Sequence, residues 1–192
     1  MEFVSRAGEK LAFALKEFEI VVKDFVCADL GCSTGGFTDC LLQNGATKVY
    51  AVDTGYGVLD WKLRNDNRVV VMERTNAMQV LLPEKMDFVS VDTSWTKQKN
   101  ILPKAISLIK ENGVIVSLIK PHYEADKRHL VKGKLKEEFL KETLEKVKND
   151  LADLHLEILG FIKSPITGKS GKNEEYLAYL KLKKGVLISF FT

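Results

Sequence analysis

The sequence has few cysteines and no long apolar run, and both shortages exclude classes of protein. Its 192 residues include three cysteines, with no C-x-x-C pair, so neither a disulfide framework nor a zinc site is expected, and we predict no metal. We interpret Cys27, Cys32 and Cys40 as small buried side chains in a reducing cytoplasm. No apolar run approaches the roughly 20 residues of a membrane-spanning helix. The opening letters MEFVSRAGEK also lack the apolar centre of a signal peptide.

An excess of charge of one sign is also missing, because the net charge is only +3. The distribution of the charge is more informative than its sum. The stretch DKRHLVKGKLK, residues 126–136, sets five cations against the single acid Asp126. The five cations are Lys127, Arg128, Lys132, Lys134 and Lys136. Two interpretations stay open for this stretch, a solvated loop and a surface that binds RNA phosphates.

Short apolar segments alternate with amphipathic segments along most of the chain, which predicts strands and helices in turn. Strands are expected at 26–30, 48–53, 69–73, 87–92, 114–119, 156–163 and 175–183. Helices are expected at 5–18, 35–44, 58–65, 76–82, 99–111 and from about 135 to 150. Short apolar strands separated by helices imply a parallel sheet covered on both faces. We therefore expect residues 1–192 to form one doubly wound α/β domain with a mostly parallel, seven-stranded sheet.

The stretch VCADLGCSTGGFTDC, residues 26–40, ends a strand in a glycine-rich turn that three kinds of protein use. Residues 31–35 fit the G-x-S-x-G pattern of a hydrolase nucleophile elbow. That interpretation fails on placement, because Ser33 follows the first strand and no earlier strand loop exists to complete an oxyanion hole. A dinucleotide-binding loop would need a glycine where Ser33 stands. An S-adenosylmethionine loop is the third interpretation.

Two aspartates favour the third interpretation. Asp29, at the end of the first strand, would repel a pyrophosphate but suits the cationic amino group of S-adenosylmethionine. Asp53 ends the second strand about 20 residues after the loop, where a carboxylate can accept both ribose hydroxyls. A capping role for Asp29 and a turn-forming role for Asp53 before Gly55 remain alternatives. The cofactor-binding residues predicted here are Asp29, Gly31, Ser33, Thr34, Gly35, Gly36, Phe37 and Asp53.

Charged residues also stand at other strand ends, and open α/β sheets place their sites at the carboxyl edge. Asp92 ends the fourth strand in FVSVDTSW, and Lys120 ends the fifth in VIVSLIKPHYE. Lys10 lies on the first helix and Glu175 opens the last strand. A ribose hydroxyl is a poor acid, and a desolvated lysine can serve as its base while carboxylates position the lysines. No Asn-Pro-Pro-Tyr-like motif for base methylation follows the fourth strand.

These stretches together resemble the TlyA, or haemolysin A, group of FtsJ-like ribosomal RNA 2′-O-methyltransferases. The resemblance rests on FVSRAGEKL, DLGCSTGGFTDCLLQNGATKVYAVDTGYGVLDWKLRNDNRVVVMERTN, VDTSW, LIKPHYEA and SPITGKSGKNEEYLAYL, which cover nearly the whole chain. It implies S-adenosylmethionine as cofactor, ribosomal RNA or ribosomal subunits as partners, and a place in the cytoplasm. The family's catalytic Lys-Asp-Lys-Glu tetrad falls on Lys10, Asp92, Lys120 and Glu175. It also implies that Asn76, in ERTN, contacts the adenine.

The sequence departs from the family pattern at two places. Family members usually have a small S4-like RNA-binding domain before VSR, and we expect this chain to be without it. The loop at 125–134 is shorter and more basic than the family's glycine-rich version. Two alternatives of other classes are a haemolysin-like membrane-active protein and a non-catalytic RNA-binding module. The first lacks a spanning segment, and the second is disfavoured because the whole tetrad is present.

Overall fold

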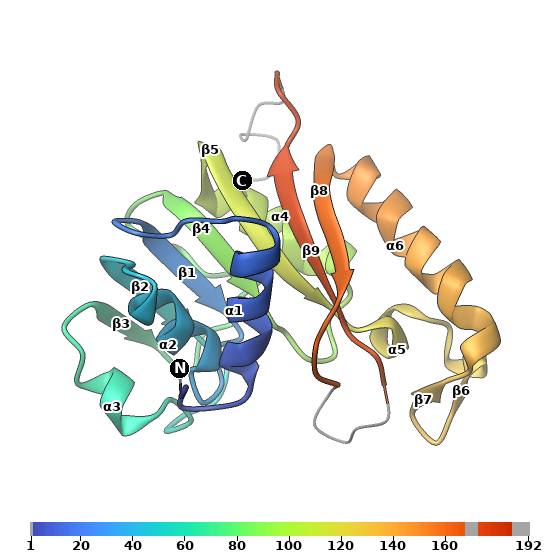
Figure 1. Ribbon diagram of the computed structural model, residues 1–192, viewed down its shortest axis with the longest axis horizontal. Helices are drawn as coiled ribbons and strands as arrows, with labels where there is room; N and C mark the ends of the chain where they lie inside the picture. Colours follow the sequence, from blue (N-terminus) through green and yellow to red (C-terminus); the bar gives the residue numbers. More distant parts are fainter. Residues whose placement is uncertain (1, 168–172, 186–192) are drawn as a thin grey trace.

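The centre of the molecule is a seven-stranded sheet in the order β3-β2-β1-β4-β5-β9-β8 (Figure 1). The computed structural model describes residues 2–167 and 173–185. The parallel strands are β1 (Val26–Leu30), β2 (Lys48–Val52), β3 (Val69–Met72), β4 (Met86–Val91) and β5 (Ile109–Ile119). Strand β9 (Tyr176–Leu182) pairs antiparallel with both β5 and β8 (Leu156–Lys163). The predicted fold class, a doubly wound and mostly parallel α/β sheet, is confirmed.

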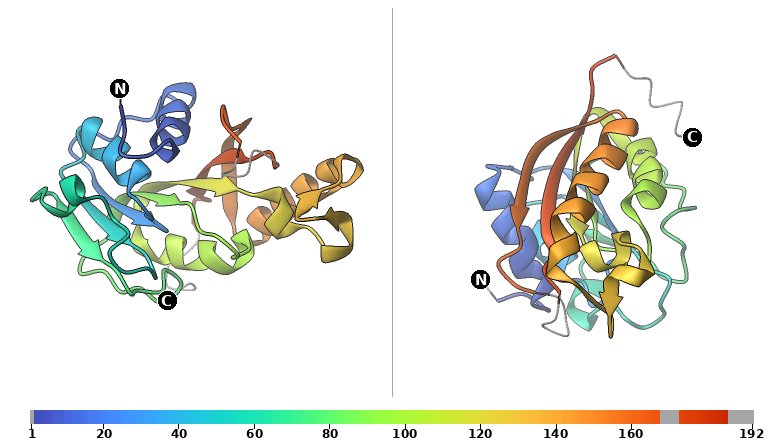
Figure 2. Two further views of the ribbon diagram at one scale, coloured as in Figure 1. Left: turned by 90° about the horizontal axis from the view of Figure 1, so that it is seen from below. Right: turned by 90° about the vertical axis from the view of Figure 1, so that its right-hand side faces the viewer.

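Helices cover both faces of this sheet (Figure 2). One face packs against α1 (Ala7–Glu17) and α2 (Gly36–Gln43), and the other against α4 (Gln98–Leu108) and α6 (Leu140–Asp153). Leu11 and Leu41 belong to the first apolar core, and Ile101 and Leu151 belong to the second. Strands buried on both faces read as nearly continuous apolar runs, which is why the sequence shows them so clearly.

Shorter helices and strands lie at the carboxyl edge of the sheet. They are α3 (Trp61–Arg64), α5 (Pro121–Glu124) and the 3-10 turns η1 (Lys127–His129) and η2 (Glu137–Phe139). Strands β6 (Leu130–Val131) and β7 (Lys134–Leu135) form a small antiparallel hairpin beside the start of α6 (Figure 1). In the described part of the chain, none of the helices is long and apolar enough to cross a bilayer.

Four predicted helices differ from the structure. The one expected at 58–65 is shortened to the single turn α3, which begins after its cap Asp60. Residues 76–82 form turns instead of a helix, because the Asn76 side chain accepts a hydrogen bond from the Met78 amide (3.0 Å) and Pro83 disfavours a helix before it. Helix α4 ends at Leu108 because Ile109 is already extended and pairs with Met86 in β4. The last helix begins at 140 because the residues before it form the β6–β7 hairpin and the 3-10 turn η2. Within the predicted turn at 164–173, residues 168–172 lie outside the described residues.

Candidate active site

The loop after β1 brings the ends of two neighbouring strands together. Gly31 has a φ of +90°, and a side chain there would come within 2.6 Å of the Asp92 carbonyl oxygen at the end of β4. Only glycine adopts this conformation and permits this close approach without strain. The next residues of the loop and the residues after β4 therefore lie side by side at the carboxyl edge of the sheet.

Two adjoining cavities open at this edge. Both are lined by Gly31, Ser33, Asp92 and Ser94, so these residues form the wall between them. One cavity, of about 360 Å³, contains Lys10, Asp92, Lys120 and Glu175, and we call it the lysine cavity. The other, also about 360 Å³, contains Asp53 and Asn76, and we call it the Asp53 cavity. Two adjoining cavities with shared lining residues can hold two ligands next to each other.

The Asp53 cavity has the groups that a nucleoside requires. The Asp53 carboxylate accepts hydrogen bonds from the Ser33 amide (2.9 Å) and the Gly55 amide (2.7 Å), which hold it at the cavity wall. Each carboxylate oxygen has a further lone pair that can accept a ribose hydroxyl. Asn76 lies in the same cavity, with its side-chain oxygen bonded to the Met78 amide. The residues present therefore fit the adenosine part of S-adenosylmethionine.

Glu73, just after β3, fixes the loop that follows β2, and the sequence reasoning missed it. Its carboxylate pairs with the Arg64 side chain and accepts backbone hydrogen bonds from residues 57–59. Arg64 and these amides lower the pKa of Glu73 to about 2. The only signal in the sequence was an acid next to a strand end, in ERTN.

Asp29 lies beneath the loop and lines neither cavity. It is fully buried, and its carboxylate accepts hydrogen bonds from the Thr38 hydroxyl (2.7 Å) and the Ser90 hydroxyl (3.0 Å). Burial raises its pKa to about 7, although both hydroxyls act in the opposite direction. Asp29 thus ties α2 and β4 to the end of β1 and lies outside the lining of the Asp53 cavity. The predicted contact of Asp29 with the cofactor's amino group stays a prediction.

Some residues of the glycine-rich turn line the cavities, and others contact neighbouring helices and loops. Ser33 lines both cavities, whereas Thr34 and Phe37 line the lysine cavity alone. Gly35 and Gly36 line neither: a side chain at Gly35 would collide with Leu59 and Leu63, and one at Gly36 with α1. These two glycines therefore permit close helix packing, and their predicted contacts with the cofactor stay predictions.

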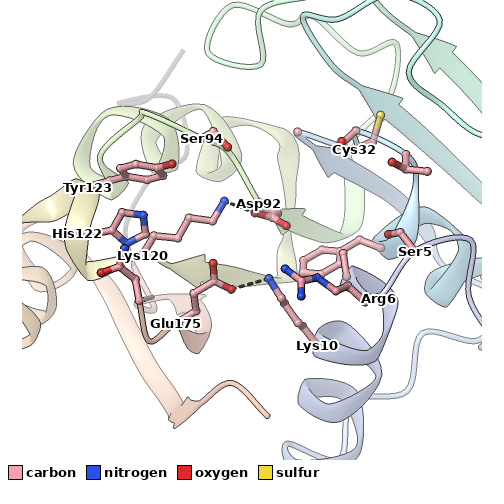
Figure 3. Close-up of a pocket in the computed structure, with 16 residues that line it drawn as sticks. Ser5, Arg6, Lys10, Cys32, Asp92, Ser94, Lys120, His122, Tyr123 and Glu175 are labelled. Carbon is pink, nitrogen blue, oxygen red and sulfur yellow. Dashed lines mark hydrogen bonds and ion pairs between the residues drawn. The ribbon is translucent and has the colours of Figure 1, made fainter. Parts of the chain in front are cut away.

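The four tetrad residues meet in the lysine cavity as two ion pairs (Figure 3). Lys120 Nζ forms an ion pair with Asp92 Oδ1 at 2.5 Å and donates a hydrogen bond to the Thr93 carbonyl (3.2 Å). Lys10 Nζ lies 2.5 Å from Glu175 Oε2. The side chains of the second pair are 8% and 4% exposed, compared with 13% and 20% for the first. The cavity thus holds two ammonium groups, each neutralised by a carboxylate.

Sheet topology explains why these residues meet. Asp92 and Lys120 follow the parallel neighbours β4 and β5, so both stand at the carboxyl edge. Strand β9 runs in the opposite direction, and its first residue, Tyr176, pairs with Ile119 of β5. Glu175 therefore stands beside Lys120 although it precedes its strand, and α1, which packs on one face of the sheet beside β9, supplies Lys10.

The lysine cavity also contains residues that the sequence reasoning missed. His122, Tyr123 and Arg6 surround the ion pairs, and Asn173 lies at the same opening. Burial lowers the pKa of His122, and the charge of Lys120 lowers it further. His122 Nδ1 is buried and has no hydrogen-bond partner among the described residues. The sequence signal for His122 as a site residue was its position, two residues beyond Lys120 at the carboxyl edge of the sheet.

The five basic residues predicted to bind RNA lie outside the lysine cavity, around the β6–β7 hairpin. All five side chains are exposed: Lys127, Arg128, Lys132, Lys134 and Lys136. Asn173 connects this hairpin to the active site, because its side chain accepts a hydrogen bond from the Leu135 amide (3.1 Å) and donates one to the Gly133 carbonyl (3.0 Å). The exposed cations are thus held beside the cavity that contains the tetrad.

Comparisons with known proteins agree with this geometry. The chain is 42% identical to YqxC of Bacillus subtilis over 189 residues, which cover 94% of the chain and 66% of that protein. It is 40% identical to the protein named 16S/23S rRNA (cytidine-2'-O)-methyltransferase TlyA of Mycobacterium tuberculosis, covering 93% of the chain and 68% of that protein. The chain thus spans about two thirds of the length of both relatives.

A crystal structure of a Lactococcus lactis protein that was given a hemolysin name superposes with a TM-score of 0.89 at 37% identity. The match covers 100% of this chain and 97% of that one. Residues 3–182 match the family described as FtsJ-like methyltransferase. Membership of this family supports S-adenosylmethionine as the cofactor predicted from the sequence. The chain belongs to the FtsJ-like methyltransferase family.

Proposed function

We propose that this protein transfers a methyl group from S-adenosylmethionine to a ribose 2′-hydroxyl of ribosomal RNA. The observation that supports this most is the meeting of Lys10, Asp92, Lys120 and Glu175 in one cavity that shares a wall with the Asp53 cavity. The name of the Mycobacterium tuberculosis relative, a cytidine-2'-O rRNA methyltransferase, agrees with it. A non-catalytic RNA-binding module would not need four charged side chains paired and largely withdrawn from water.

The Asp53 cavity would hold the cofactor. The Asp53 carboxylate would accept the ribose hydroxyls of the cofactor, and Asn76 would contact its adenine. When bound, S-adenosylmethionine supplies a methyl group that is open to attack by an oxygen nucleophile. Gly31 and Ser33, which line both cavities, would separate the nucleoside part of the cofactor from the substrate and leave the reacting atoms facing the lysine cavity.

The lysine cavity would hold the ribose hydroxyl and manage its proton. Lys120 Nζ is paired with the Asp92 carboxylate and donates a hydrogen bond to the Thr93 carbonyl, so its position is fixed before the substrate arrives. Lys120 can accept the hydroxyl proton only as a neutral amine, so it would first release one of its own protons to solvent at the cavity opening, while the Asp92 carboxylate keeps it in place. The Lys10–Glu175 pair would orient the ribose from the opposite side of the cavity.

The basic hairpin would contribute RNA affinity. Its exposed cations can neutralise backbone phosphates without reading a base, and such contacts position a nucleic acid. Because they lie outside the lysine cavity, they are expected to influence RNA binding and not the methyl transfer itself. A ribosomal RNA substrate would place the protein in the cytoplasm.

The test is incubation of the protein with radiolabelled S-adenosylmethionine and ribosomal subunits from a strain that lacks the gene. Label in the RNA, located by nuclease mapping at one or a few nucleotides, is the expected result. Lys120→Met serves as the control, because it removes the proton-accepting amine and leaves the Asp53 cavity intact. An RNA that stays unlabelled with a protein that binds S-adenosylmethionine would contradict the proposal.

A further inference from the structure

A third cavity, of about 340 Å³, opens next to the lysine cavity and is lined in part by β7 of the hairpin. His122 and Asn173 line both cavities and therefore form the wall between them. We call the third cavity the hairpin cavity. Its position matters because anything that leaves the lysine cavity across this wall enters the hairpin cavity next.

The lining of the hairpin cavity suits a flat, mostly neutral group. Its apolar part consists of Pro121, Leu135 and Leu140, and the His122 imidazole offers an aromatic face. Pockets with an apolar lining and a few placed polar groups are typical of sites for flat organic ligands. The volume and the surfaces are therefore appropriate for a nucleobase.

The charges in this cavity argue against a phosphate. Two carboxylates, Glu137 and Glu174, line it together with one ammonium group, Lys134. The Glu174 carboxylate is held by Lys163 and by the Tyr176 hydroxyl (2.9 Å), so it is fixed in place. Carboxylates repel a phosphate but accept hydrogen bonds from the amino and imino groups of a base. Lys134 is the one cation among these three charged residues. Because its side chain is exposed, it can contact the backbone phosphate next to the bound base.

We propose that the hairpin cavity binds the base of a nucleotide next to the one whose ribose enters the lysine cavity. The inference rests on the proposed function, because it requires an RNA strand at the tetrad. The strand would cross the wall of His122 and Asn173 between the two cavities. The same Asn173 holds the hairpin through the Leu135 amide and the Gly133 carbonyl, so binding of the neighbouring base and the position of the hairpin are connected.

The experiment uses RNA that contains the mapped nucleotide, in the form, subunit or fragment, that the first assay shows to be methylated. Single abasic residues replace the nucleotide on either side of the methylated one. Base stacking in a protein pocket is worth enough that losing the base should raise KM by about 5- to 100-fold. We expect this rise at one of the two neighbours, with little change in kcat.

Variants that fill the cavity complete the test. Leu140→Trp should raise KM on intact RNA and abolish the difference between intact and abasic RNA, with unchanged affinity for S-adenosylmethionine. Glu137→Trp, at an exposed position that folding does not depend on, should act in the same way. Val131→Trp, on the same hairpin but outside the cavity lining, is the matched control and should behave like the wild type.

The results separate the two proposals. An RNA that the wild type does not methylate would contradict the proposed function. If methylation occurs but abasic residues on both sides leave KM unchanged, the hairpin cavity does not bind a neighbouring base. The same conclusion follows if Leu140→Trp and Glu137→Trp still discriminate abasic from intact RNA as strongly as the wild type does. If the two cavity variants lose affinity for a protein partner but keep wild-type kinetics on RNA, the hairpin cavity binds a protein and not a base.

Discussion

The lysines of the lysine cavity and those of the β6–β7 hairpin are the same type of residue in two different surroundings. Lys10 and Lys120 are largely withdrawn from water, and each lies 2.5 Å from a carboxylate. Lys132, Lys134 and Lys136 are exposed. The two groups belong to neighbouring parts of the molecule, because Asn173 lies at the lysine cavity and also bonds to the hairpin.

The difference shows that surroundings decide what a lysine can do. A buried lysine with fixed acceptors has one position, and its amine can act at one atom. An exposed lysine keeps its hydration and its rotamer freedom, so it attracts phosphates at long range but positions little. Substitutions in the lysine cavity should therefore change the rate of methyl transfer, and substitutions on the hairpin should change affinity.

The largest effect is expected from Lys120→Met, which removes the proposed proton acceptor. General-base catalysis typically contributes 10²–10⁴-fold, so methyl transfer in single turnovers should fall by about that factor. The affinities for S-adenosylmethionine and RNA should stay near wild type, as calorimetry and filter binding would show. Lys99→Met, at an exposed position on α4, is the matched control.

Lys120→Arg sharpens the same prediction. Guanidinium keeps the positive charge but does not release a proton at neutral pH, so this variant should be as inactive as Lys120→Met. If Lys120→Arg retains most of the activity, Lys120 acts as a fixed charge and another group must accept the proton.

The second prediction concerns the pH dependence that burial gives to the active-site region. The pKa of Asp29 is raised to about 7 in the folded protein, whereas an exposed aspartate titrates near 4. Between these values the folded state keeps a proton that the unfolded state releases, so stability should fall as the pH rises. Between pH 5 and 8 the contribution of Asp29 to the free energy of unfolding should fall by about 2–3 kcal/mol.

Asp29→Asn, a neutral side chain of the same shape, should lose this contribution. Urea unfolding of both proteins at pH 5 and pH 8 measures it as the difference between the two pH dependences. Identical pH dependences would mean that Asp29 titrates in the folded state as it does in the unfolded chain.

The third prediction is a loss of cofactor affinity in Asp53→Ala. Hydrogen bonds to a charged acceptor are worth about 1.5–3 kcal/mol, so the Kd for S-adenosylmethionine should rise about 10- to 100-fold. Asp60→Ala is the control. Asp60 also follows β2 and caps α3, but it lies outside the lining of the Asp53 cavity. An unchanged Kd in Asp53→Ala would remove Asp53 from the cofactor site.

The smallest effect is expected on the hairpin. Replacing Lys132, Lys134 and Lys136 with glutamate should weaken RNA binding about tenfold at moderate salt and flatten the dependence of affinity on salt. The rate of methyl transfer at saturating RNA should stay near wild type. Filter binding over a range of salt concentrations measures both quantities.

The matched control makes the same change of charge elsewhere, with glutamates at Lys16, Lys23 and Lys99, all exposed. If both triple variants show the same salt dependence, net charge alone explains the effect and the hairpin is a solvated loop. If only the hairpin variant differs from the wild type, the position of its cations matters.

The sequence was most informative where the backbone alone decides the outcome. Asp92 and Lys120 end parallel strands, and the carboxyl ends of parallel strands meet at one edge, so their meeting follows from the order of elements. The proximity of Glu175 depends on the reversed direction of β9, which the sequence does not show directly. In that case the resemblance to a family supplied what the pattern did not.

The sequence was least informative where tertiary contacts decide. An aspartate before a glycine-rich turn can face a ligand or support the turn, and the choice for Asp29 depends on hydroxyls contributed by Thr38 and Ser90. Small residues serve both close ligand approach and close packing, and Gly35 meets the side chains of Leu59 and Leu63. No local pattern distinguishes these outcomes.

The central claim, that a ribose 2′-oxygen receives the methyl group, can be tested directly on the RNA product. RNA labelled with radioactive S-adenosylmethionine is hydrolysed in alkali, which cleaves after every nucleotide that has a free 2′-hydroxyl. We predict that the label will be recovered in alkali-resistant dinucleotides, because a methylated 2′-oxygen blocks cleavage at that position. Label recovered in mononucleotides would show that a base was methylated and would contradict the account.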